Sequence, residues 1–80
     1  MPDKEADARL CLAFGAWVRQ LRHRRKLTQG EVASRVGITV TYLSQIETGQ
    51  RNPTLAVVAR LARALDIKPS KLVARLDEFE

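Results

Sequence analysis

The side chains that could perform covalent or metal chemistry are few in this sequence of 80 residues. Cys11 is the one cysteine and His23 the one histidine, so the chain offers neither an internal disulfide nor a Cys- or His-rich metal site. No nucleophile stands near a base, no carboxylates pair at a plausible site, and no glycine-rich phosphate loop occurs. A chain this short buries only about 60% of its unfolded surface, which leaves no room for a deep pocket beside a core. We therefore predict a protein that is not an enzyme and that holds no metal and no other cofactor.

Hydrogen-bonding chemistry is concentrated on one side of a helix predicted for residues 39–48. Leu43 and Ile46 mark its apolar side. The side chains that face away from them are Val40, Thr41, Ser44 and Gln45. A glutamine amide can pair with N6 and N7 of adenine, a threonine can bond a base or place its methyl group beside thymine, and a valine can contact a thymine methyl. Outside a DNA-binding motif, such a face is simply solvated. Within one, we expect these four residues to read bases, with Gln45 the strongest candidate.

The charge distribution favours an anionic partner. Residues 1–8 hold one basic and three acidic side chains, residues 77–80 hold three acidic ones, and residues 9–76 hold 13 basic and three acidic ones. So basic a body suits nucleic acid or a membrane surface, although a solubilising surface would have the same composition. The arginines are not gathered on one amphipathic helix, which argues against a membrane. We also expect no membrane span and no signal peptide, and hence a reducing, cytoplasmic location.

Helical spacing of apolar residues along the chain predicts a single all-α domain over residues 1–80. The predicted helices span residues 6–26, 29–36, 39–48, 55–65 and 70–76, and residues 1–6 and 77–80 are expected to be flexible ends. Thr28 and Glu31 have the spacing of a capping box, and Gly37 has the position of a helix stop. On the first helix, Phe14 and Trp17 are predicted to be core residues and not a ligand platform, because aromatic side chains provide most of the burial in a small core.

The second and third helices are joined by a turn too short to let them lie antiparallel, so they must cross steeply. A small residue, Ala33, permits the close approach, and Gly37 supplies the turn. Apolar residues fill the positions that hold the pair together: Val32, Val36, Ile38, Leu43 and Ile46. These demands define a helix-turn-helix over about residues 29–48, whose second helix enters the DNA major groove.

The same stretch resembles the Cro/cI-type (XRE-like, lambda-repressor-like) helix-turn-helix proteins. The resemblance covers residues 18–76 and rests on these segments: Leu27-Thr28-Gln29, Tyr42-Leu43-Ser44-Gln45-Ile46-Glu47, Gly49 and Arg51-Asn52-Pro53. It implies a five-helix DNA-binding domain that acts as a homodimer on a two-fold symmetric operator of double-stranded DNA. Such a protein would be a bacterial or phage transcriptional regulator: a repressor, an autoregulator or a restriction-modification controller. Because 80 residues leave no room for a separate effector domain, we expect no small-molecule effector. An antitoxin-like module that binds a partner protein is the alternative.

The resemblance also assigns roles to individual residues. It implies contacts with the DNA backbone for Gln29, Thr39, Tyr42, Arg51 and Asn52, which would position the protein rather than specify a sequence. The placement of Gln29 is physically sensible, because a helix N-terminus presents free N–H groups and a positive dipole end to a phosphate.

Two further pairs of residues are given structural roles. The resemblance implies an ion pair between Arg22 and Glu47 that ties the first helix to the end of the third. Leu76 and Phe79 would form a dimer surface if they are exposed, as the resemblance suggests. A disordered tail over residues 77–80 is the other interpretation of that end.

Overall fold

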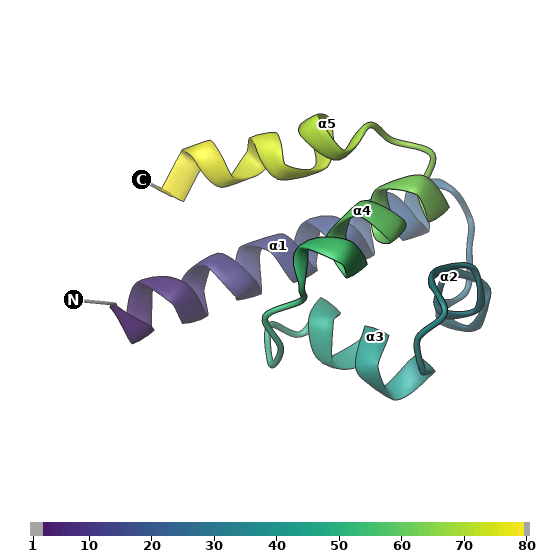
Figure 1. The fold of residues 1–80 in the computed structure, drawn as a ribbon, viewed down its shortest axis with the longest axis horizontal. Helices are drawn as coiled ribbons and strands as arrows, with labels where there is room; N and C mark the ends of the chain where they lie inside the picture. Colours follow the sequence, from purple (N-terminus) through teal and green to yellow (C-terminus); the bar gives the residue numbers. More distant parts are fainter. Residues whose placement is uncertain (1–2, 80) are drawn as a thin grey trace.

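The computed structural model describes residues 3–79, with the side chain of Phe79 outside the description. Within that part, the chain forms five α-helices and a final 3₁₀ helix and no strand, so the predicted all-α, five-helix fold is confirmed. Figure 1 shows the elements in chain order, which are α1 (Lys4–Arg24), α2 (Gln29–Val36), α3 (Val40–Glu47), α4 (Leu55–Ala64), α5 (Pro69–Ala74) and η1 (Arg75–Phe79).

The two ends of the chain are more regular than the sequence predicted. Helix α1 begins at Lys4 because the Asp3 carboxylate caps it, accepting hydrogen bonds from the backbone N–H groups of Glu5 and Ala6 at 3.0 and 3.1 Å. Residues 4–6 thus form its first turn, and residues 77–79 belong to η1. The remaining residues of the two predicted flexible ends, 1–2 and 80, lie outside the described part.

Helix α1 ends at Arg24, two residues earlier than predicted. Lys26 takes a left-handed conformation with φ of 57°. The backbone N–H of Leu27 donates to the carbonyl of Arg22 at 3.1 Å, and that of Lys26 donates to the carbonyl of His23 at 3.0 Å. This pair of bonds is the Schellman arrangement that terminates helices, here without the usual glycine.

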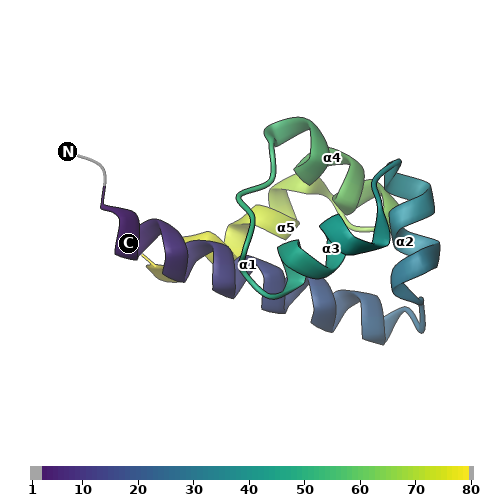
Figure 2. The same ribbon diagram turned by 90° about the horizontal axis from the view of Figure 1, so that it is seen from below.

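The core lies between α1 and the four shorter helices. Figures 1 and 2 show α1 running the length of the molecule, with α5 and η1 along one side of it and α2 and α3 packed near its C-terminal half. All five helices contribute buried side chains, and the largest fully buried ones are Leu43, Ile46, Leu61, Leu65, Leu72, Val18, Val32 and Val36. Burial of these aliphatic groups is the main stabilising term for a domain of this size.

Helices α1 and α3 cross in close contact at Gly15. A Cβ atom built there would lie 2.0 Å from the carbonyl oxygen of Ile46, so only glycine fits without moving the backbone. Phe14, next to it, is buried as predicted. Trp17 instead lies half-buried at the edge of the core, where the guanidinium group of Arg75 covers its ring at 4.1 Å from the ring centroid.

Candidate nucleic-acid interface

Helices α2 and α3 form a rigid pair. The Thr28 hydroxyl accepts from the backbone N–H of Glu31, and the Glu31 carboxylate accepts from the backbone N–H of Thr28, both at 3.0 Å. This capping box fixes the start of α2. At its other end, Gly37 has φ of 81°, and the N–H groups of Gly37 and Ile38 both donate to the carbonyl of Ala33. The turn therefore has the left-handed geometry that the sequence predicted for this glycine.

The side of α3 that faces away from the core carries the four residues predicted to read bases. Thr39 caps the helix, because its hydroxyl accepts from the backbone N–H of Tyr42 at 3.0 Å. Val40 and Thr41 are exposed, and 47% of the Val40 surface is accessible although the side chain is apolar. Ser44 and Gln45, one turn further along, are half-buried. The arrangement leaves hydrogen-bonding groups and one apolar side chain on the same open face.

Arg51 folds back onto α3 from the loop that follows it. Its Nε donates to the side-chain carbonyl oxygen of Gln45 at 3.0 Å, and its guanidinium carbon lies 5.9 Å from the centre of the Tyr42 ring. Arg51 thus contacts two residues predicted for different roles, Gln45 for base reading and Tyr42 for backbone binding. Asn52 is exposed beside Arg51.

A buried polar cluster anchors the C-terminal end of α3. The Arg22 guanidinium forms two bonds with the Glu47 carboxylate, Nε to Oε2 at 2.7 Å and Nη2 to Oε1 at 3.1 Å. Nη1 of Arg22 donates to the backbone carbonyl of Leu27, and Nε2 of Gln29 donates to Oε1 of Glu47. Gln29 was predicted to bind a phosphate. In the structure one of its amide N–H groups bonds Glu47, and this contact fixes its position at the N-terminus of α2.

An open hollow of about 580 Å³ lies between α1, the start of α2 and the end of α3. Gln29 and Ser44 line it, and two exposed basic residues of α1 and the turn after it, Arg19 and Lys26, line the same hollow. The sequence did not single out Arg19 and Lys26 as neighbours of Gln29 and Ser44, because the proximity of α1 to α3 is a tertiary feature. The hollow has the hydrogen-bond donors and positive charge that a phosphate group requires.

Several other arginines are used within the fold. Arg35 donates to the carbonyl of Ala64 at 3.4 Å, Arg60 donates to the carbonyl of Val36 at 3.3 Å, and Arg25 donates to the carbonyl of Asp66 at 3.1 Å. The first two oxygens belong to the C-terminal ends of α4 and α2, where a positive charge also offsets the helix dipole. Part of the basic excess therefore stabilises helix ends, while Arg19, Lys26 and Arg51 remain beside α3.

The two residues predicted for a dimer surface, Leu76 and Phe79, belong to η1, outside the helix-turn-helix. Leu76 is half-buried against the core and lines a small apolar hollow of about 80 Å³ together with Leu10, Phe14 and Val58. Asn52 borders this hollow as well. Phe79 ends η1, and its side chain lies outside the described part. The exposure on which the predicted surface depends is thus partial for Leu76.

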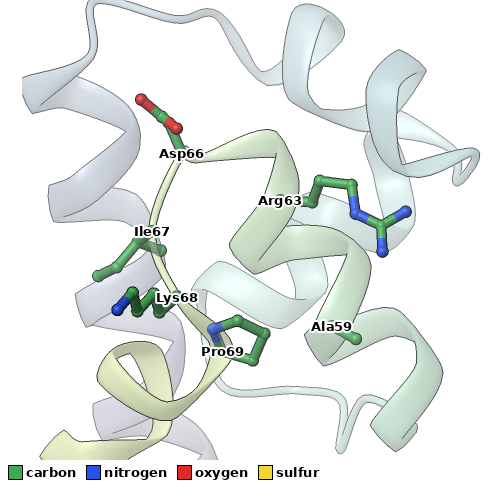
Figure 3. A pocket seen from close by; sticks show the side chains of 6 residues that line it. All are labelled: Ala59, Arg63, Asp66, Ile67, Lys68 and Pro69. Carbon is green, nitrogen blue, oxygen red and sulfur yellow. The ribbon is translucent and has the colours of Figure 1, made fainter.

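Other features of the described residues offer no competing site. Figure 3 shows a hollow beside the α4–α5 turn, lined by Ala59, Arg63, Asp66, Ile67, Lys68 and Pro69, none of which belongs to the predicted interface. Burial, followed by the charge of Asp7, raises the pKa of the Cys11 thiol above its usual value. Residues 3–79 contain no cluster of metal-binding side chains, and none of their helices is long and apolar enough to span a membrane.

Comparison with known proteins identifies the fold. A family model described as a helix-turn-helix domain matches residues 13–76. The chain belongs to this helix-turn-helix family. Among curated relatives, the uncharacterised HTH-type transcriptional regulator y4dJ of Sinorhizobium fredii is 44% identical over 74% of this chain and 77% of its own length. Control protein C.BamHI of Bacillus amyloliquefaciens is 35% identical over 78% of this chain and 78% of its own length.

Solved structures agree with the sequence relatives. The restriction-modification controller protein C.AhdI of Aeromonas hydrophila superposes on 78% of this helix-turn-helix chain with a TM-score of 0.75 and 39% identity, and 94% of that protein is covered. Several other curated relatives are longer, and the chain spans about half of their length. The resemblance predicted from the residues between Val18 and Leu76 is confirmed by these comparisons.

Proposed function

We propose that this helix-turn-helix protein binds double-stranded DNA in a sequence-specific manner and thereby regulates transcription. The observation that carries the proposal is the open face of α3. Val40 and Thr41 are exposed on it, and Ser44 and Gln45 are half-buried. On the other face, Leu43 and Ile46 are completely buried against the core. A helix held in this way can enter a major groove as a rigid unit.

Base contacts would come from Val40, Thr41, Ser44 and Gln45. Contacts with the DNA backbone would come from residues around this face. Gln29 and the hollow lined by Arg19 and Lys26 lie beside the C-terminal end of α3. The further candidates are Thr39, Tyr42, Arg51 and Asn52. Such phosphate contacts fix the register of the helix, and the base contacts then select the sequence. Similarity to regulators and controller proteins supports the same function, and no catalytic activity is part of it.

The protein would act as a homodimer on a two-fold symmetric operator. One α3 helix reaches only a few base pairs, so a second copy one helical turn away is needed for a site of useful length. The surface around Leu76 and the Phe79 segment is the proposed dimer contact. Sedimentation of the free protein tests it, because Phe79→Ser should lower the measured mass from dimer toward monomer. Val40→Ser, an exposed apolar residue on the proposed DNA face, should leave the mass unchanged.

The decisive experiment is selection from a random pool of duplex DNA, followed by sequencing of the retained molecules. A two-fold symmetric enriched sequence supports the function. A folded protein that enriches no sequence at moderate salt would contradict it and would favour a protein-binding module. The logarithm of the association constant for the enriched site should fall linearly with the logarithm of the salt concentration. Arg19→Gln should make that slope less steep without changing the preferred sequence.

A further inference from the structure

Gln45 is positioned by a residue outside its own helix. Arg51 Nε donates to Oε1 of Gln45 at 3.0 Å. A guanidinium group has hydrogen-bond donors only, so the oxygen and not the nitrogen of the Gln45 amide must face it. The contact therefore fixes which end of the amide is engaged and which end is left for another partner.

The Arg51 side chain that makes this contact is itself restrained. Gly49 has φ of 78° and reverses the chain after α3, and the backbone N–H of Gln50 donates to the carbonyl of Gln45 at 2.8 Å. A Cβ atom on Gly49 would lie 2.6 Å from Cα of Leu12, so the turn is packed against α1. The guanidinium also lies 5.9 Å from the centre of the Tyr42 ring. The loop thus delivers Arg51 to Gln45 before any ligand is present.

The polar groups that remain available at this point are donors. The Gln45 amide keeps the two hydrogens of Nε2, and the Arg51 guanidinium keeps those of its Nη atoms. In the major groove, guanine presents two acceptors, N7 and O6, whereas adenine presents one acceptor and one donor, its N6 amino group. The amide oxygen has a second lone pair, but the adjacent guanidinium charge disfavours the approach of another donor.

We propose that Arg51 determines the base preference of Gln45. By holding Oε1, it makes the Gln45 amide read guanine in place of the adenine that a free glutamine prefers. The proposal rests on the proposed function, since it presumes that α3 enters the major groove. Arg51 would then act as a positioning residue for base recognition, and not only as a contact with the DNA backbone.

The test compares the sequences that four proteins select from the same random duplex pool: wild type, Gln45→Ala, Arg51→Met and the control Arg63→Met. Arg63 lines the hollow beside the α4–α5 turn, to which no residue of α3 contributes, so its replacement removes the same charge elsewhere. Gln45→Ala identifies the base pair of each half-site that depends on Gln45. The measured quantity is the ratio of guanine to adenine at that pair, which does not depend on overall affinity.

The wild type and Arg63→Met should prefer guanine there, and Arg51→Met should lower the guanine-to-adenine ratio by about tenfold. A wild-type preference for adenine at that pair, a ratio unchanged in Arg51→Met, or a selected site in which no pair depends on Gln45 would each overturn the inference while leaving the proposed function intact. Failure of the wild type to enrich any sequence would instead overturn the proposed function, and the inference with it. Circular dichroism of Arg51→Met confirms that the variant is folded, as its exposed position leads us to expect.

Discussion

Arg22 and Glu47 are joined by two hydrogen bonds across 25 residues of sequence, and only 8% and 5% of their surfaces are exposed. The pair connects α1 to the last turn of α3. Leu27 and Gln29 complete its hydrogen bonding, at the segment where α2 begins. The three elements that must keep a fixed geometry for α3 to enter a groove therefore meet at one buried polar cluster.

Replacing Arg22 with methionine should destabilise the fold by about 3–5 kcal/mol, because it leaves the buried Glu47 carboxylate without its counter-charge. Arg24→Met is the matched control. Arg24 is exposed and stacks on the Trp17 ring at 5.4 Å, so its loss should cost less than about 1 kcal/mol. Urea denaturation followed by circular dichroism measures both. Equal midpoints for the two variants would show that the ion pair has no special role.

Removing both charges should be tolerated better than removing one. In Arg22→Met with Glu47→Leu, no buried charge is left without a partner, and apolar groups of similar volume fill the space. We expect the double variant to recover at least half of the stability that Arg22→Met loses. The double variant also removes the hydrogen bond between Gln29 and Glu47, which Arg22→Met leaves in place. A double variant as unstable as the single one would therefore indicate that the loss of this bond cancels the gain from removing the unpaired charge.

The crossing of α1 over α3 should be intolerant of any side chain at Gly15. A methyl group there would overlap the backbone of Ile46, and relieving the overlap by moving α3 should cost about 1–3 kcal/mol or more. Gly30 provides the opposite case within α2, since its Cβ would meet only the Thr28 hydroxyl at 3.8 Å. Gly30→Ala should stabilise the protein by about 0.5–1 kcal/mol through reduced chain entropy. Thermal denaturation of the two variants distinguishes them by the sign of the change, and stabilisation by Gly15→Ala would contradict the observed crossing.

The sequence predicted the helix order and the α2–α3 pair because both depend on local signals. Thr28 and Glu31, the apolar spacing and Gly37 act within a few residues of one another, and their roles are the same in the structure. The first helix was placed two residues too far toward the C-terminus at both ends. Its true start depends on Asp3, and its true end on Lys26 adopting a conformation that favours glycine.

The contacts within the candidate interface were less predictable. The resemblance named both members of the Arg22–Glu47 pair, but nothing in the sequence indicated that Gln29 joins them or that Arg51 bonds Gln45. These contacts depend on how three separated segments pack. The close approach at Gly15 had one sequence signal, an isolated glycine inside a helical pattern, which identifies such positions without saying what lies opposite.

Replacing Lys26 with glycine should stabilise the protein. A left-handed residue with a Cβ atom is strained by about 1–2 kcal/mol, and glycine adopts the same φ of 57° without that strain. We expect Lys26→Gly to raise the free energy of unfolding by up to about 1 kcal/mol. Lys71→Gly, within α5, removes the same side chain from a helical position and should lower it by about 1 kcal/mol. Urea unfolding tests both, and equal losses would mean that the Schellman ending of α1 is not maintained in solution.

The capping box at the start of α2 should make a small, pH-dependent contribution to stability. The hydrogen bond from the Thr28 backbone N–H, and after it that with the Thr28 hydroxyl, holds the pKa of the Glu31 carboxyl below its usual value of 4.5. Because the folded-state pKa is lowered, the contribution is fully present above pH 4.5 and is lost as the pH falls through the folded-state value. Glu31→Gln keeps an acceptor for the Thr28 N–H but cannot ionise. The stability difference between wild type and Glu31→Gln should therefore shrink as the pH is lowered from 6 to 3 in a series of urea titrations. A difference that stays constant over that range would mean that the carboxylate does not interact with Thr28 in the folded protein.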